Sequence, residues 1–233
     1  MITAIVIASG SGKRMGQDIP KQFISVYDKP VLIYTLDSFQ QHPQIDAIEV
    51  VCLDGWQDVV RAYAKQYGIH KLQWITVGGD TAQDSIRNGV FNLRDKLNDE
   101  DMVIIHDGVR PLIDEAVLTN VIVVCKEKGN AVSAMPYNEQ IFIADDETST
   151  VKYIPRETLR RVVTPQAYMY GKLYEKYTEA YEKKIGIYGS AYTNTMMVEL
   201  GERLYFAPGS DKNIKLTTSG DLKIFKAYVK ADR

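Results

Sequence analysis

The sequence has few of the residues that mark several common protein classes. Its 233 residues include only two cysteines and three histidines. Cys52 and Cys125 lie in apolar runs far apart in the chain, so we expect buried reduced thiols rather than a disulfide. No His/Cys cluster has the spacing of a zinc site. Reduced thiols are typical of a cytoplasmic protein.

Excess charge and long hydrophobic runs are also absent. The net charge is −2, which gives no basis for general binding to nucleic acid or to a membrane surface, so any anion site must be local. No stretch approaches the roughly 18 apolar residues of a membrane span. The N-terminal apolar run 2–8 is too short for a signal peptide and leads directly into glycines and cations. We therefore expect a cytoplasmic location.

Short β-branched runs alternate with helical patterns through the first half of the chain. The predicted strands are 3–8, 47–53, 72–77, 101–107 and 130–136, and the predicted helices are 29–42, 55–68, 81–97 and 114–129. Near-continuous apolar strands separated by helices predict an α/β fold, with a Rossmann-like, mostly parallel sheet sandwiched by helices. Ligands in such folds bind beyond the carboxyl ends of the strands.

The pattern changes after residue 136. Two alternating runs around an acidic turn predict a β-hairpin within an inserted arm at about 137–155. Such a hairpin is not stable alone, so we expect it to protrude and to pack on a second subunit. A helix over 170–184, a strand over 203–208, and a strand plus a capped helix over 213–231 complete a single domain spanning 1–233.

A glycine-rich segment with three cations follows the first predicted strand. Its glycines are Gly10, Gly12 and Gly16, and its cations are Lys13, Arg14 and Lys21. Backbone amides in such a turn can converge on an anion, so the segment favours a phosphate site. The pattern fits neither the Walker P-loop nor the dinucleotide fingerprint. The alternative is a solvated loop with incidental lysines.

The string ASGSGKRMGQDIPKQF resembles the signature of nucleotidyltransferases that activate a phosphate with an NTP, especially the cytidylyltransferases acting on methylerythritol phosphate and ribitol phosphate. The matching residues are Ala8, Ser9, Gly10, Gly12, Arg14, Met15, Pro20, Lys21 and Gln22. Further matches are GGDTAQDSIRNGV, HDGVRP, an arginine eight residues before TPQ, and NIKLTT…DL. Five motifs in the right order cover nearly the whole chain.

The resemblance implies a role for residues in every motif. Catalytic cations are Arg14, Lys21 and Lys215; nucleotide-binding residues are Ala8, Ser9, Gly10, Gly12, Lys13, Gly79, Asp80, Ser85 and Asp107; substrate-binding residues are Arg110, Arg156, Thr164 and Thr193. The substrate phosphate attacks the α-phosphorus of CTP in line and pyrophosphate leaves, so cations and metal must offset the developing charge.

Asp107 ends an apolar run, where a carboxylate has no structural reason to be. We expect it to bind Mg²⁺, which prefers carboxylate and phosphate oxygens. The alternatives are a turn former for Asp107, an exposed helix residue for Ser85 and a solvated strand residue for Lys215. His106 is expected to be structural, because a phosphate nucleophile needs no general base.

Departures from the family pattern concern the substrate. Ala82 replaces a family arginine, and Glu139, Gln140 and Asn194 replace residues usual in the methylerythritol enzymes. We infer a Mg²⁺-dependent cytidylyltransferase that makes a CDP-alditol, from ribitol 5-phosphate, glycerol phosphate or a relative, for a surface polymer. The alternatives are a methylerythritol phosphate cytidylyltransferase of isoprenoid synthesis and a nucleotide-binding protein without catalysis. The resemblance also implies a homodimer that exchanges arms.

Overall fold

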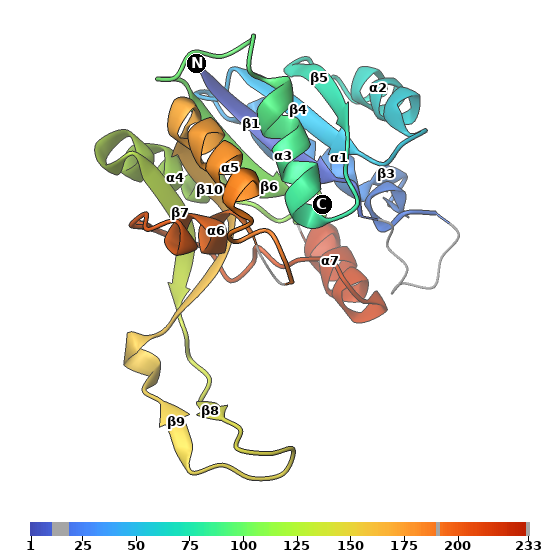
Figure 1. Ribbon diagram of the computed structural model, residues 1–233. Helices are drawn as coiled ribbons and strands as arrows, with labels where there is room; N and C mark the ends of the chain where they lie inside the picture. The colour runs from blue at the N-terminus through green and yellow to red at the C-terminus, as the bar shows by residue number, and fades with distance from the viewer. Residues whose placement is uncertain (11–18, 190–191, 232–233) are drawn as a thin grey trace.

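A seven-stranded sheet forms the centre of the computed structural model, which describes residues 1–10, 19–189 and 192–231 (Figure 1). Its strands, in the order β11-β7-β10-β6-β1-β4-β5, are Phe206–Pro208, Asn130–Pro136, Arg160–Met169, Met102–Asp107, Ile2–Ala8, Ala47–Cys52 and Leu72–Val77. Strands β6, β1, β4 and β5 are parallel, and β11 is parallel to β7. Strand β10 runs antiparallel to both its neighbours. The predicted mostly parallel sheet is confirmed.

Helices cover both faces of this sheet. One face carries α1 (Val31–Gln41), α2 (Gln57–Gln66) and α4 (Glu115–Lys128), and the other carries α3 (Ala82–Asn92), α5 (Tyr170–Lys183) and α6 (Thr193–Glu199). Helix α7 (Ser219–Ala231) packs in a smaller cluster with Val109. The predicted sandwich of helices around the sheet is confirmed.

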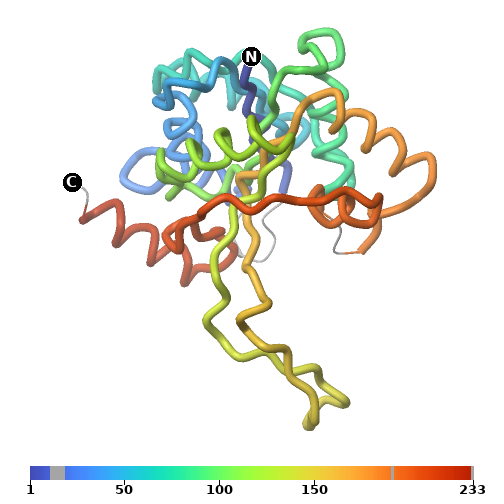
Figure 2. Tube along the Cα trace, turned by 90° about the vertical axis from the view of Figure 1, so that its left-hand side faces the viewer, coloured from blue at the N-terminus to red at the C-terminus, as the bar shows by residue number. Residues whose placement is uncertain are grey.

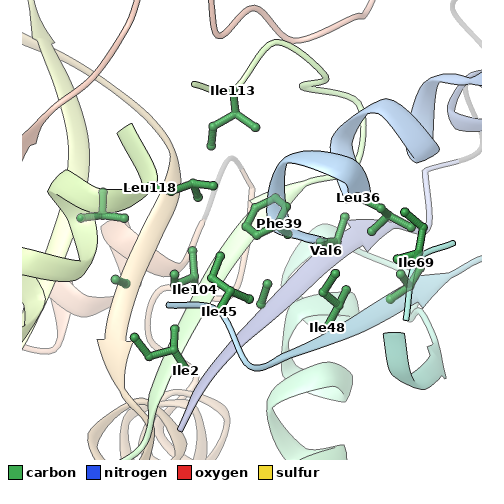
Figure 3. Close-up of a cluster of buried hydrophobic side chains, with 14 of the residues drawn as sticks. Ile2, Val6, Leu36, Phe39, Ile45, Ile48, Ile69, Ile104, Ile113 and Leu118 are labelled. Carbon is green, nitrogen blue, oxygen red and sulfur yellow. The ribbon is translucent and has the colours of Figure 1, made fainter. Parts of the chain in front are cut away.

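Alternation along β1 divides the apolar core between the two faces. Ile2 and Val6 pack toward Phe39 of α1, whereas Ile5 packs with Val90 of α3. Figure 3 shows the first of these clusters around β1 and α1. Because successive side chains of a strand point to opposite faces, an uninterrupted apolar run is the sequence pattern of a strand buried on both sides.

A hairpin arm projects from one end of the body (Figures 1 and 2). Its strands β8 (Ile141–Ile143) and β9 (Lys152–Ile154) pair antiparallel, as the alternating pattern predicts. The 3-10 turn η3 (Arg156–Thr158) leads back into β10. Two short strands, β2 (Ser25–Val26) and β3 (Lys29–Pro30), form a separate hairpin after the 3-10 turn η2 (Lys21–Phe23).

Two parts of the second half differ from the expectations. Strand β10 was not predicted, because Pro165 interrupts its apolar run and proline disfavours a central strand. The sheet accommodates this proline at an irregularity between Val163 and Gln166. The strand predicted before the terminal helix in 213–231 is wrong, since residues 213–218 form no ladder and Leu216 instead donates its amide to the Val109 carbonyl at 2.9 Å.

The structure also agrees with the prediction of buried, reduced thiols. Cys52 and Cys125 are free and buried, as predicted. Burial raises the pKa of the Cys52 thiol to about 11, so this thiol stays protonated and unreactive near neutral pH. Of the helices that the structure describes, none has both the length and the apolar character needed to cross a bilayer.

Candidate active site

A cavity of about 610 Å³ lies at the carboxyl ends of β1 and β6. Eleven of the residues to which the resemblance assigns a site role line it: Ala8, Ser9, Gly10, Lys21, Gly79, Asp80, Ser85, Asp107, Thr164, Thr193 and Lys215. They come from strand ends, from the loop before α3, from the start of α6 and from the segment before α7. The fold thus gathers residues from distant motifs around one cavity.

Two of the predicted site residues that the structure describes, Arg110 and Arg156, do not line this cavity. Gly12, Lys13 and Arg14 lie outside the described residues. Arg110 is close behind the cavity wall, where it bonds to Asp107. Arg156 lies on the arm, where it donates to the Asn138 carbonyl at 3.5 Å and pairs with Glu157 at 3.6 Å.

Lys21 reaches the cavity from a firmly anchored turn. Pro20 starts this turn with its fixed φ, and the Phe23 ring stacks on Trp56 with the ring centroids 4.3 Å apart. The buried Gln22 amide donates to the carbonyls of Ala8 at 2.7 Å and Gly10 at 3.0 Å. The turn that carries Lys21 is therefore tied to the base of the glycine-rich segment.

The nucleotide wall, named for the role that the sequence resemblance implies and defined as residues 78–85 with Ser9, is a close-packed part of the structure. The Ser9 hydroxyl donates to Ser85 at 2.8 Å, and the Ser85 oxygen accepts the Gly79 amide at 3.1 Å. A Cβ on Gly78 would lie 2.3 Å from the Ser9 Cβ, so only glycine fits there. Ser85 is buried, which excludes the alternative of an exposed helix residue.

Asp107 is the centre of an ion-pair cluster. Its Oδ1 accepts from Lys215 Nζ at 2.9 Å, and its Oδ2 accepts from Arg110 Nε at 2.8 Å. Its backbone amide donates to the Thr164 hydroxyl at 3.2 Å. The alternative of a solvated strand residue is therefore wrong for Lys215, which lines the cavity and forms an ion pair with Asp107.

The two cations decide the charge of Asp107. Burial alone would raise the pKa of this carboxyl, but the charges of Lys215 and Arg110 outweigh burial and hold the pKa well below its usual range. Asp107 therefore stays ionised near neutral pH. Lys215, which lines the cavity and is oriented by this ionised carboxylate, is suited to binding a phosphate group.

His106 has a structural role, as the sequence indicates. It is fully buried and its Nε2 lies 3.2 Å from the Arg110 carbonyl, to which it donates as a neutral ring. Burial lowers its pKa to about 4, so it is uncharged at neutral pH. The ring holds the turn between Asp107 and Arg110 in place.

Another part of the cavity lining is called here the acceptor wall, for the substrate-binding role that the resemblance implies for Thr164 and Thr193. It consists of Thr164, Gln166, Tyr192, Thr193 and Lys215. Sequence reasoning missed Gln166 and Tyr192. The Tyr192 ring is half exposed, and its centroid lies 6.0 Å from Lys215 Nζ. The position of Tyr192 next to Thr193 could have identified it from the sequence, because a large aromatic residue beside a site residue contributes to the same cavity.

Comparisons with known proteins agree with this geometry. The family model described as IspD, 2-C-methyl-D-erythritol 4-phosphate cytidylyltransferase, matches residues 2–231. The ribitol-5-phosphate cytidylyltransferase of Lacticaseibacillus paracasei is 59% identical over 99% of this chain and 98% of its own. The 2-C-methyl-D-erythritol 4-phosphate cytidylyltransferase of Desulforamulus reducens is 32% identical over 98% and 96%.

A solved structure shows the same fold. The 4-diphosphocytidyl-2C-methyl-D-erythritol synthase of Anaerococcus prevotii superposes with a TM-score of 0.83 at 24% identity, covering 99% of this chain and 96% of its own. The fold and the relatives together define a nucleotidyltransferase. Within that class, the chain belongs to the IspD family of cytidylyltransferases.

Proposed function

We propose that the protein transfers the cytidylyl group of CTP to ribitol 5-phosphate, releasing pyrophosphate and forming CDP-ribitol for a cell-surface polymer. The observation that supports this acceptor is the 59% identity to a ribitol-5-phosphate cytidylyltransferase across 99% of the chain. Identity to the methylerythritol phosphate enzymes of Desulforamulus reducens and Alkaliphilus metalliredigens is lower, at 32% and 33%. The free thiols of Cys52 and Cys125 fit a cytoplasmic enzyme.

The cavity residues fit the steps of this reaction. A phosphate oxygen of ribitol 5-phosphate forms a bond to the α-phosphorus of CTP, and the bond from that phosphorus to the bridging oxygen of pyrophosphate breaks. No proton transfer is needed, because the nucleophile is an anion. Lys21 and Lys215 line the cavity and stabilise the charge of the transition state. The match to the family motif assigns the same role to Arg14.

Mg²⁺ fits the donor set of this cavity. Its described lining carries the carboxylates of Asp80 and Asp107 against the two lysines, so it has no excess positive charge for a triphosphate. Asp107 Oδ1 accepts one hydrogen bond, from Lys215, and keeps a second lone pair for a cation, whereas Oδ2 accepts from both Arg110 and the Thr164 hydroxyl. Bound through Asp107 and phosphate oxygens, Mg²⁺ would neutralise charge on the triphosphate.

The experiment measures pyrophosphate release by the purified protein with CTP and Mg²⁺. We expect release with ribitol 5-phosphate, and a far smaller kcat/KM with 2-C-methyl-D-erythritol 4-phosphate and glycerol phosphate, since a pocket that hydrogen-bonds specific hydroxyls discriminates strongly. A preference for methylerythritol phosphate would assign the second function instead. CTP binding without release from any acceptor would indicate a nucleotide-binding protein.

Lys215→Met provides the matched test of the site. Removing one electrostatic stabiliser lowers kcat by about 10² to 10³. Lys223→Met, an exposed lysine of α7, is the control and keeps wild-type kcat. Equal activity of the two variants would contradict the placement of catalysis in this cavity.

A further inference from the structure

A buried hydrogen-bond chain runs behind the cavity and joins α3, α5 and α6. The Gln83 amide nitrogen donates to the Gly186 carbonyl at 2.9 Å. The Tyr177 hydroxyl bonds to Gln83 Oε1 at 3.0 Å and to Thr193 Oγ1 at 2.7 Å. The exposed fractions of Gln83, Tyr177 and Thr193 are 2%, 0% and 1%, so these bonds do not compete with bulk water.

The direction of each proton in this chain follows from its donors and acceptors. Because the Gly186 carbonyl takes the Gln83 amide nitrogen, the Gln83 oxygen must face Tyr177. An amide oxygen only accepts, so the one phenol proton of Tyr177 goes to Gln83. Tyr177 then accepts the proton of Thr193. The rotation of the Thr193 side chain is thereby fixed from behind.

This hydrogen-bond chain connects two groups of residues that line the cavity. Thr193 is the first residue of α6 and lines the acceptor wall. Gln83 lies between Ala82 and Ser85, which line the nucleotide wall at the start of α3. Tyr177 itself does not line the cavity. It can therefore affect a ligand only through the residues that it holds.

A second tyrosine of the same helix shows what a purely structural hydroxyl does here. Tyr170 is also fully buried, and its hydroxyl donates to the Val90 backbone carbonyl of α3 at 3.0 Å. Both tyrosines thus fasten α5 to α3. Only Tyr177 bonds to a side chain that lines the cavity.

We propose that Tyr177 is a positioning residue: it takes the Thr193 proton, leaves the Thr193 oxygen to accept a hydrogen bond from a hydroxyl of the acceptor polyol phosphate, and ties Thr193 to the nucleotide wall through Gln83. The proposal rests on the proposed function for the identity of the acceptor. It adds a residue outside the cavity to those that decide acceptor binding.

The test compares Tyr177→Phe with Tyr170→Phe, which lose the same atom from the same helix. For Tyr177→Phe, KM for ribitol 5-phosphate rises about tenfold, the effect expected for a lost buried hydrogen bond, while KM for CTP changes less than twofold. For Tyr170→Phe both constants stay within twofold of wild type. Equal effects of the two variants on the acceptor KM overturn the proposal.

A double-mutant cycle with Thr193→Val asks whether Tyr177 acts through Thr193. When Thr193 has no hydroxyl, adding Tyr177→Phe lowers kcat/KM for the acceptor by less than twofold further. If the loss of kcat/KM in the double variant equals the product of the losses in the two single variants, the two residues act independently, which contradicts the proposal. If Tyr177→Phe fails to fold, Gln83→Leu breaks the same chain at its other end, and a raised acceptor KM is again expected.

The assay uses the alditol phosphate that the wild-type enzyme turns over. Lack of turnover of ribitol 5-phosphate by wild type counts against the proposed function alone. The positioning role fails if the Tyr177 and Tyr170 variants match, or if the losses in the double-mutant cycle multiply, whichever acceptor is used.

Discussion

Asp107 shows how single residues set the chemistry of the cavity. It binds Arg110, three residues along the chain, and Lys215, 108 residues away. A carboxylate held by two cations stays ionised and keeps both of them in fixed positions. Replacing Asp107 would therefore change two cations as well as one anion.

Glu49 is a second buried carboxyl at the residue scale, away from the cavity. It lies in the middle of β4, and its Oε1 accepts from Thr76 at 2.5 Å and Asn92 at 2.8 Å. Its Oε2 is buried and has no hydrogen-bond partner among the described residues. Burial raises the pKa of this carboxyl to about 7, against the opposing effect of the two hydrogen bonds.

The raised pKa of Glu49 predicts how stability depends on pH. Between about pH 4.5 and 7 the folded protein keeps a proton that the unfolded chain has released, so this contribution to stability falls as pH rises and is lost above about pH 7. The full loss is about 3 kcal/mol. Glu49→Gln removes this slope, measured by urea unfolding at several pH values, whereas Glu127→Gln on the exposed side of α4 keeps it. An unchanged slope in Glu49→Gln would contradict the assignment.

At the scale of elements, the contact between α3 and the sheet positions the nucleotide wall. Gly89 of α3 packs directly on β1 and β4, where an added Cβ would lie 2.9 Å from Ile5 Cγ2 and 2.8 Å from Val51 Cγ2. Both distances are shorter than an ordinary carbon–carbon contact. Any larger residue must therefore push α3, and Ser85 with it, away from the sheet.

We predict that Gly89→Ala destabilises the fold and weakens CTP binding. Overpacking costs about 1 to 3 kcal/mol, and the better helix propensity of alanine returns about 1 kcal/mol of that. Gly220→Ala in α7 is the control, since its Cβ would meet the nearest atom at 3.5 Å. For Gly89→Ala, chemical denaturation should show a lower free energy of unfolding, and the Kd for CTP should rise. For Gly220→Ala, both quantities should stay close to the wild-type values. Wild-type stability of Gly89→Ala would show that α3 can repack freely.

The same elements show what the sequence could predict. The four parallel strands β1, β4, β5 and β6 are nearly continuous apolar runs, interrupted by single polar residues such as Glu49 and Gln73. Motif residues lie at the ends of β1, β5 and β6, so both the fold and the position of the cavity follow from local patterns. Strand β10 was missed, because its register irregularity offsets a proline that local rules exclude. The bond between Gln83 and Tyr177 joins residues 94 positions apart, and no local pattern encodes it.

For the whole molecule, the arm is the feature that a monomer does not explain. Its strands pair over only three residues each, and a hairpin this short is marginal in water without a partner. Phe142 and Tyr153 on these strands are 56% and 68% exposed, and Val151 beside them is 88% exposed. We predict a homodimer in which each arm packs on the neighbouring subunit.

The predicted dimer can be tested by the oligomeric state of a variant with substitutions on the arm. Replacing Phe142 and Tyr153 together by Asp places charges where the partner should cover apolar rings, so the variant sediments as a monomer at micromolar concentration while wild type sediments as a dimer. Val123→Asp, an exposed apolar position of α4, is the control and leaves the dimer intact. A monomeric wild type would contradict the prediction.

Arg156 makes the dimer testable through activity. It lies on the arm outside the cavity of its own chain, although it matches a substrate-binding arginine, so we expect it to complete the partner's cavity. Co-expression of Arg156→Ala and Lys215→Met chains then creates heterodimers with one site that has both wild-type residues. Random pairing makes half of the dimers mixed, so about a quarter of wild-type activity returns although each variant alone is impaired. If Arg156 served its own chain, every site in the mixture would lack one of the two cations, and co-expression would restore nothing.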